Sequence, residues 1–189
     1  LLEVLNIAPM TSLFTTPRQV HCQKSQTNGG KQTVRTQIYE HRSGLKVVPR
    51  DIISDVEKIL WDINPILSKR TVASIKESVR ERLEKEGWTG EYRLDSSSRI
   101  TISSYLKGIG MCFQTGNVGR IYADLLKLQT LYTKGNITAG IILIPQIKTA
   151  KELGSNMANY ERLIRELPIF SQVITMPIVV IGFDGTEEA

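Results

Sequence analysis

The sequence contains few of the residues on which common catalytic and metal-binding sites depend. Only two histidines and two cysteines occur in 189 residues, and Cys22 and Cys112 lie far apart with no CxxC motif. This pattern argues against a disulfide framework and a structural zinc site, and it suits the reducing cytoplasm. No GxGxxG follows a predicted strand, and no P-loop, GxSxG or HExxH motif occurs, which disfavours the chemistries that those motifs carry.

Long apolar runs are absent as well. The longest candidate, "AGIILIPQI", is far shorter than the roughly 18 residues that span a membrane. The segment "LLEVLNIAPM" lacks the basic residues of a signal peptide, so we expect none and no membrane association. The chain is 41% hydrophobic and 23% charged, as in soluble globular proteins, and its net charge of +5 leans mildly toward a polyanionic partner.

The first 32 residues differ from the rest of the chain. Within residues 1–32, the segment "TTPRQVHCQKSQTNGGKQ" is polar and shows no sustained periodicity, which predicts a flexible N-terminal arm over residues 1–32, and residues 33–189 are expected to form a single domain. The strand-like "TVRTQIY" and "LKVV" flank a Ser43-Gly44 pair, which predicts a hairpin. His41 then falls in the turn, as a surface residue.

Two helices are expected next. The first begins at Asp51, which can cap it, and ends at the Asn64-Pro65 pair; its apolar residues recur at helical spacing. The second begins with Ser74 and Glu77, which have the spacing of a capping box, and ends near Gly87.

A strand, a helix and a second strand follow within about 35 residues, a length typical of parallel strands joined by a crossover. The strands are "GIGMCFQ" and "ITAGIILIP"; Asn117 can cap the helix between them. A further helix, "SNMANYERLIREL", and a strand, "MPIVVIGF", complete an α/β fold with a central mixed β-sheet flanked by helices. Alternation puts Cys112 and Gln114 on one face of the first strand and Met111 and Phe113 on the other.

The motifs "GIGMCFQTGN", "GIILIPQIK", "SNMANYERL" and "MPIVVIGF", together with "LEKEGW" and "IYEHRSGLKVV" upstream, occur in one order. In this order they resemble the BamHI/BglII group of type II restriction endonucleases over residues 33–184. The resemblance implies a restriction-endonuclease-like fold and a homodimer that cleaves palindromic duplex DNA. It also implies Mg²⁺ bound by carboxylates of the PD-(D/E)xK type.

The resemblance also assigns a candidate catalytic site. Asp95 matches the loop aspartate, Glu91 an additional acidic residue, and both are expected to bind the metal. Gln114 matches the end of the strand motif E-x-E or E-x-Q, and Cys112 stands where these relatives have the metal-binding glutamate. Because a thiol is a poor magnesium ligand, either Asp95 and Glu91 still hold a metal weakly or the protein binds DNA without cutting it well. Alternatively, Cys112 is simply a small buried hydrophobe.

For DNA recognition, the resemblance points to Asn117 after the catalytic strand and to Ser155 and Asn156 in a later loop. Amide side chains can pair with adenine through two hydrogen bonds. The default target is a site centred on GATC, which known members of the group share. Asn117 could instead serve only as a helix N-cap, or do both, and Ser155 and Asn156 could merely begin a helix.

The function expected from the sequence is therefore that of a type II restriction endonuclease in the cytoplasm. One alternative is a cleavage-impaired DNA-binding homologue of the same fold. A second is an unrelated α/β interaction module whose basic charge is incidental.

Overall fold

The computed structural model describes residues 19–20, 34–67 and 71–185. Its strands are β1 (Gln19–Val20), β2 (Arg35–His41), β3 (Tyr92–Arg93), β4 (Thr101–Ile102), β5 (Ser104–Leu106), β6 (Ile109–Phe113), β7 (Ala139–Pro145) and β8 (Ile178–Asp184). Its helices are α1 (Gly44–Val47), α2 (Arg50–Leu67), α3 (Val72–Lys85), α4 (Gly119–Thr133), α5 (Ile147–Leu153), α6 (Tyr160–Glu166) and the 3-10 helix η1 (Leu167–Phe170).

Six of the strands form one mixed sheet in the order β1-β2-β8-β7-β6-β5, and β3 and β4 form a separate pair. The neighbours β6, β7 and β8 run parallel, whereas β2 and β5 pair antiparallel at either side of them. The predicted strand–helix–strand unit is thus confirmed as β6–α4–β7. The parallel strand β7 is apolar throughout and β8 is apolar up to its last residue, Asp184, as expected of strands covered on both faces.

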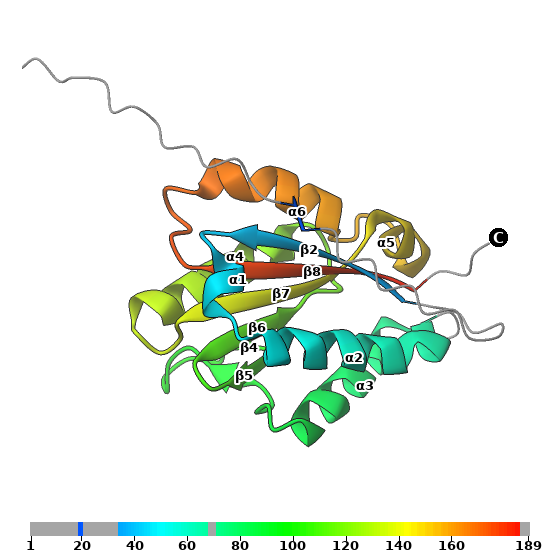
Figure 1. Ribbon diagram of the computed structural model, residues 1–189, viewed down its shortest axis with the longest axis horizontal. Coiled ribbons are helices and arrows are strands. Elements are labelled where there is room, and N and C mark those ends of the chain that lie inside the picture. Colours follow the sequence, from blue (N-terminus) through cyan, green and yellow to red (C-terminus); the bar gives the residue numbers. More distant parts are fainter. Residues whose placement is uncertain (1–18, 21–33, 68–70, 186–189) are drawn as a thin grey trace, which may run out of the picture.

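Helices cover both faces of this sheet (Figure 1). The apolar residues of α2 and α3 pack on the face that carries Met111 and Phe113 of β6. Those of α4 and α6 pack on the opposite face, which carries Cys112. The predicted fold class and the predicted alternation along β6 are therefore confirmed.

The hairpin expected at Ser43-Gly44 is wrong. After β2, Arg42 and Ser43 adopt left-handed backbone angles, and the chain enters the short helix α1. The placement of His41 is wrong for the same reason: it is the last residue of β2, it is buried, and its Nε2 lies 2.8 Å from the carbonyl oxygen of Ile174. Burial lowers the pKa of His41 below its ordinary value.

Both predicted helix starts are also displaced. Helix α2 begins at Arg50, so Asp51 lies in its first turn, and the helix continues through the Asn64-Pro65 pair to Leu67. The N-cap of α3 is Thr71, whose hydroxyl accepts a hydrogen bond from the Ser74 amide, and no capping box forms. Glu77 pairs instead with Arg80 on the exposed face of α3.

Several remaining features refine the prediction. The predicted arm lies outside the described residues except for β1, which pairs with β2, so the division at residue 33 stays a prediction. Helix α5, which the sequence pattern did not indicate, separates β7 from α6, and α6 itself begins only at Tyr160. No helix among the described residues is both long and apolar enough to cross a lipid bilayer.

Candidate active site

A polar cavity of about 310 Å³ lies where strand β6 ends and helix α4 begins. Its walls come from the segment that precedes β3, from β4, from the end of β6 and from the first turns of α4. The polar and charged side chains that line it include Glu91, Thr101, Gln114, Arg120, Asp124 and Lys127. Two carboxylates, two cations and an amide therefore face one space, which is an arrangement suited to binding a charged group.

A hydrogen-bonded chain fixes the inner wall of this cavity. The Gln114 amide nitrogen donates to Asp124, and its Oε1 accepts from the backbone N–H of Gly116 at 2.7 Å. The Nζ of Lys127 lies 3.0 Å from Oδ1 of Asp124. Because Gln114 and Asp124 are both buried, these contacts satisfy groups that would otherwise be destabilising, and they orient the Gln114 amide.

Cys112 lies beside the cavity and does not line it. It is 1% exposed and packs among apolar residues of the sheet and α4. Burial, followed by the negative charge of Asp124, raises the pKa of the Cys112 thiol well above its ordinary value. The packing thus agrees with the description of Cys112 as a small buried apolar side chain, placed next to a polar site.

The structure separates the two predicted metal ligands. Glu91 lines the cavity and accepts a hydrogen bond from Thr101 Oγ1 at 3.3 Å. Asp95 does not line it: the Asp95 carboxylate accepts from Ser97 and lies 3.1 Å from Nζ of Lys134, and these contacts hold its pKa well below the ordinary value. In the structure the two carboxylates therefore have different partners, Glu91 at the cavity wall and Asp95 at Ser97 and Lys134.

The two predicted recognition segments lie side by side. The backbone N–H of Val118 donates to the Asn156 carbonyl at 3.2 Å, and that of Ala158 donates to the Gly116 carbonyl at 2.9 Å. Asn117, Ser155 and Asn156 are all exposed at this junction.

The expected capping roles are wrong. The N-cap of α4 is Val118, with no side-chain capping bond, so Asn117 does not cap the helix. Ser155 and Asn156 form a turn between α5 and α6 and do not begin a helix. The exposed Asn117 amide makes no hydrogen bond within the described chain, which leaves it available to a ligand.

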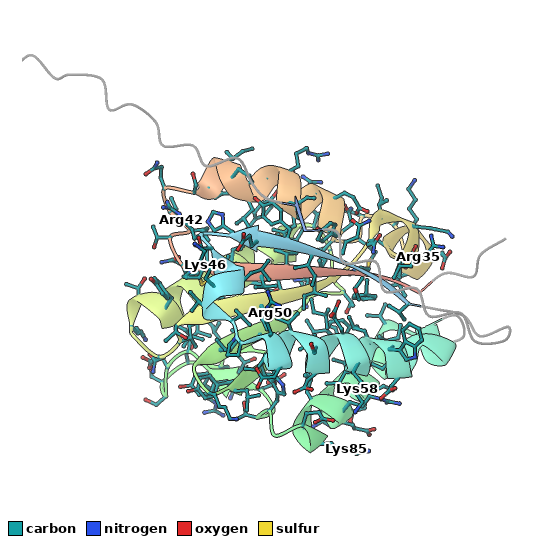
Figure 2. All side chains as sticks on the ribbon, in the orientation of Figure 1. Arg35, Arg42, Lys46, Arg50, Lys58 and Lys85 are labelled. Carbon is teal, nitrogen blue, oxygen red and sulfur yellow. The ribbon has the colours of Figure 1, made fainter. Side chains whose placement is uncertain are left out.

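The basic side chains that Figure 2 labels lie apart from one another and do not form one dense patch. Figure 2 labels six exposed basic side chains distributed from β2 and α1 to α2 and α3: Arg35, Arg42, Lys46, Arg50, Lys58 and Lys85. These six side chains therefore do not define a binding face.

A model of the restriction endonuclease BglII/BglIII family matches residues 36–183. The chain belongs to this family. The type II restriction enzyme BamHI of Bacillus amyloliquefaciens is 34% identical over 92 residues, which cover 49% of this chain and 42% of that enzyme. The match thus spans less than half the length of this relative. Family membership removes the alternative of an unrelated α/β interaction module.

Two crystal structures of BglII share the fold. The structure of BglII with a DNA 16-mer has a TM-score of 0.63 at 12% identity and covers 78% of this chain and 75% of that chain. Free BglII has a TM-score of 0.60 at 11% identity and covers 82% of each chain. At such low identity the likeness concerns the fold alone.

Members of a restriction endonuclease family generally use a divalent metal, and the donor set of the cavity permits one. Within the described residues, no three His, Cys, Asp or Glu side chains converge as a metal cage. Glu91 and Asp124 nevertheless face the same cavity with hard oxygen ligands. Magnesium is commonly held by one or two carboxylates, with waters and substrate phosphate completing its coordination, so the residues fit an ion of this kind.

Three residues that line the cavity, Asp124, Lys127 and Arg120, were not among the candidates predicted from the sequence. A signal for Asp124 was present: it follows Ile121 by three residues and precedes Leu128 by four, so helical spacing puts a lone carboxylate on the apolar face of α4. The partners of this carboxylate could not be inferred, because they depend on how α4 packs on β6.

Proposed function

We propose that the protein is a type II restriction endonuclease that hydrolyses duplex DNA at a specific palindromic site with Mg²⁺. The observation that carries this proposal is the polar cavity at the end of β6, in a chain of the BglII/BglIII family. Such an enzyme acts on DNA in the cytoplasm, in line with the few, widely spaced cysteines. The salt dependence of duplex binding provides a first test, because neutralised phosphates release counterions and make binding weaken steeply with salt.

In this proposal the side chains of the cavity receive one phosphodiester. Arg120 and Lys127 would attract the phosphate by charge, and Glu91 would offer hard oxygen ligands. A bound magnesium ion would activate a water and neutralise charge on the phosphate. Gln114, held by Gly116 and Asp124, would keep a fixed amide at the reacting group. Asp95 remains a proposed metal ligand that would have to leave Lys134 when DNA binds.

The recognition proposal concerns the exposed turns beside the cavity. Asn117, Ser155 and Asn156 would contact base edges, with GATC as the centre of the site. Support comes from their exposure and from the hydrogen bonds that join the two turns.

The change Asn117→Ala is expected to weaken binding to a GATC-containing duplex much more than binding to a random duplex. A base contact through two hydrogen bonds contributes about 1–3 kcal/mol of discrimination. Because Asn117 does not cap α4, the melting temperature should stay unchanged. Fluorescence anisotropy with both duplexes measures the difference, and Asn136→Ala, an exposed asparagine beyond the other end of α4, is the control. Equal weakening on both duplexes would contradict the assignment.

A homodimer is part of the same proposal, because a two-fold DNA site is matched by a two-fold protein. The candidate interface lies over α4 and η1. The ring of Tyr122 packs edge-on against Phe170, with centroids 5.7 Å apart. Around this pair, Leu126 is 56% exposed, Ile169 74% and Val173 60%. Neighbouring apolar side chains with this exposure are typical of surfaces that bind another protein.

The change Ile169→Glu is expected to convert the dimer to a monomer. A charge placed at the centre of an apolar interface must be desolvated without a partner, whereas on a free monomer surface it should have little effect. Sedimentation velocity measures the change, and Ile100→Glu, an exposed isoleucine in the β3–β4 loop, is the matched control. A wild-type protein that sediments as a monomer with and without DNA would contradict the dimer.

A second candidate function is a cleavage-impaired, sequence-specific DNA-binding homologue. The specific observation in its favour is Cys112, a buried thiol next to the cavity. This candidate predicts the same duplex binding and the same effect of Asn117→Ala, but no metal-dependent cleavage.

A further inference from the structure

Helix α4 places the buried carboxylate of Asp124 next to the end of strand β6. Asp124 is 7% exposed and, in the described part of the chain, is the only buried acidic residue. It is hydrogen-bonded to Gln114, ion-paired with Lys127 and close enough to interact with the Cys112 thiol. Its neighbours are thus Cys112 and Gln114 of the strand segment and the cation Lys127 on the next turn of α4.

We propose that Asp124 supplies the metal-binding carboxylate that Cys112 cannot, so that Asp124 and Glu91 hold the divalent cation together. The inference rests on the proposed function, since it concerns the cation of the same site. Both carboxylates line one cavity, and two carboxylates with waters and a phosphate oxygen satisfy magnesium. The thiol of Cys112 is a soft donor that lies outside the cavity wall, so it offers the ion little.

The Asp124 carboxylate retains capacity for an additional ligand. Its Oδ1 faces Lys127, and its Oδ2 accepts from Gln114. A carboxylate can accept about four hydrogen bonds, so each oxygen can still contact a cation. The burial of the Asp124–Lys127 ion pair favours a functional role for Asp124. A buried ion pair often contributes little to stability, and apolar residues can often replace one without loss.

Lys127 would then act as a competing cation. Its ammonium neutralises Asp124 in the structure, at 3.0 Å, and its side chain is 28% exposed, so it has a path to solvent. A divalent cation that binds Asp124 has to weaken this ion pair. Removal of the lysine charge should therefore tighten metal binding, whereas removal of the aspartate charge should weaken it.

The test measures binding of Mn²⁺ to the full chain without DNA, by electron paramagnetic resonance of the free ion. Asp124→Asn should weaken binding by at least about tenfold, and Lys127→Gln should strengthen it by about threefold or more. A matched control is Arg162→Gln, because Arg162 and Glu166 form a comparable ion pair on α6 at 2.9 Å, away from the cavity. That control should leave the affinity unchanged.

Unchanged affinity in Asp124→Asn, or unchanged or weaker affinity in Lys127→Gln, would overturn the inference. If Asp124→Asn does not fold, as judged by circular dichroism, the sign of the effect in Lys127→Gln decides. Plasmid cleavage by the wild-type protein is measured separately. If the wild-type protein cleaves plasmid but Asp124→Asn leaves Mn²⁺ binding unchanged, only this inference is refuted. If Mn²⁺ binding depends on Asp124 but the wild-type protein does not cleave plasmid, only the proposed nuclease function is refuted.

Discussion

The change Cys112→Glu is expected to make the stability of the protein depend on magnesium and to raise magnesium-dependent DNA cleavage at least about tenfold, roughly 1.4 kcal/mol of transition-state stabilisation. Position 112 is buried beside Asp124. A glutamate there adds a hard oxygen ligand, in place of a thiol that is a poor one, and restores the residue expected from the family resemblance.

Without a metal the same change should be strongly destabilising. The new carboxylate would face the negative charge of Asp124, and Lys127 is the nearby counter-charge. An uncompensated buried charge costs about 3–5 kcal/mol, which lowers the melting temperature by roughly 6–20 °C in a domain of this size. Saturating magnesium should recover most of this loss, because the ion neutralises the paired carboxylates.

Melting temperature and plasmid cleavage are measured together, with magnesium and with a chelator. Cys112→Gln is the matched control, since it has the same size without the charge. It should be destabilised without any magnesium rescue and should gain no cleavage. If Cys112→Glu behaves like this control, destabilised, indifferent to metal and inactive, position 112 is an ordinary core position.

The change Gly44→Ala is expected to destabilise the fold by about 3 kcal/mol or more, lowering the melting temperature by roughly 6–12 °C. Gly44 begins α1 directly against β8. A Cβ atom at this position would lie 2.2 Å from the carbonyl oxygen of Ile178, which is well inside van der Waals contact. Because the obstacle is the backbone of a central strand, the clash cannot be relieved by a side-chain rotation.

Thermal unfolding compares this variant with Gly119→Ala. A Cβ atom on Gly119 meets only Oδ1 of Asn117, at an ordinary 3.5 Å. Gly119 is also the first residue of α4, where alanine is at least as favourable as glycine. The control should therefore melt at or above the wild-type temperature. A Gly44→Ala variant that melts with the control would mean that α1 does not pack against β8 as described.

The core of the fold could be predicted from the sequence because its signals are local. The continuous apolar run of β7 and the helical stripe of Ile121, Leu125 and Leu128 on α4 identify buried elements by composition and period. The same alternation correctly separated Met111 from Cys112 on the two faces of β6.

The features that were missed depend on contacts between distant segments. Gly44 was interpreted as a turn residue, but its lack of a side chain is required by β8, more than a hundred residues later. His41 could not be recognised as buried without its partner Ile174. Asp124 likewise acquires its place in the site only when α4 packs against β6. Asp95, by contrast, was chosen because it matches the loop aspartate of the resembled family; it lies in the loop between β3 and β4 and does not line the cavity.

The most direct measurement is incubation of the wild-type protein with a supercoiled plasmid that contains GATC sites, in magnesium and separately in manganese. Binding to a duplex from the same plasmid is measured in parallel by a gel-shift assay in calcium. We predict duplex binding, followed by nicked and linear products that resolve into discrete fragments and disappear in EDTA. Plasmid that stays supercoiled with both metals, at protein concentrations that saturate duplex binding, would contradict the nuclease function.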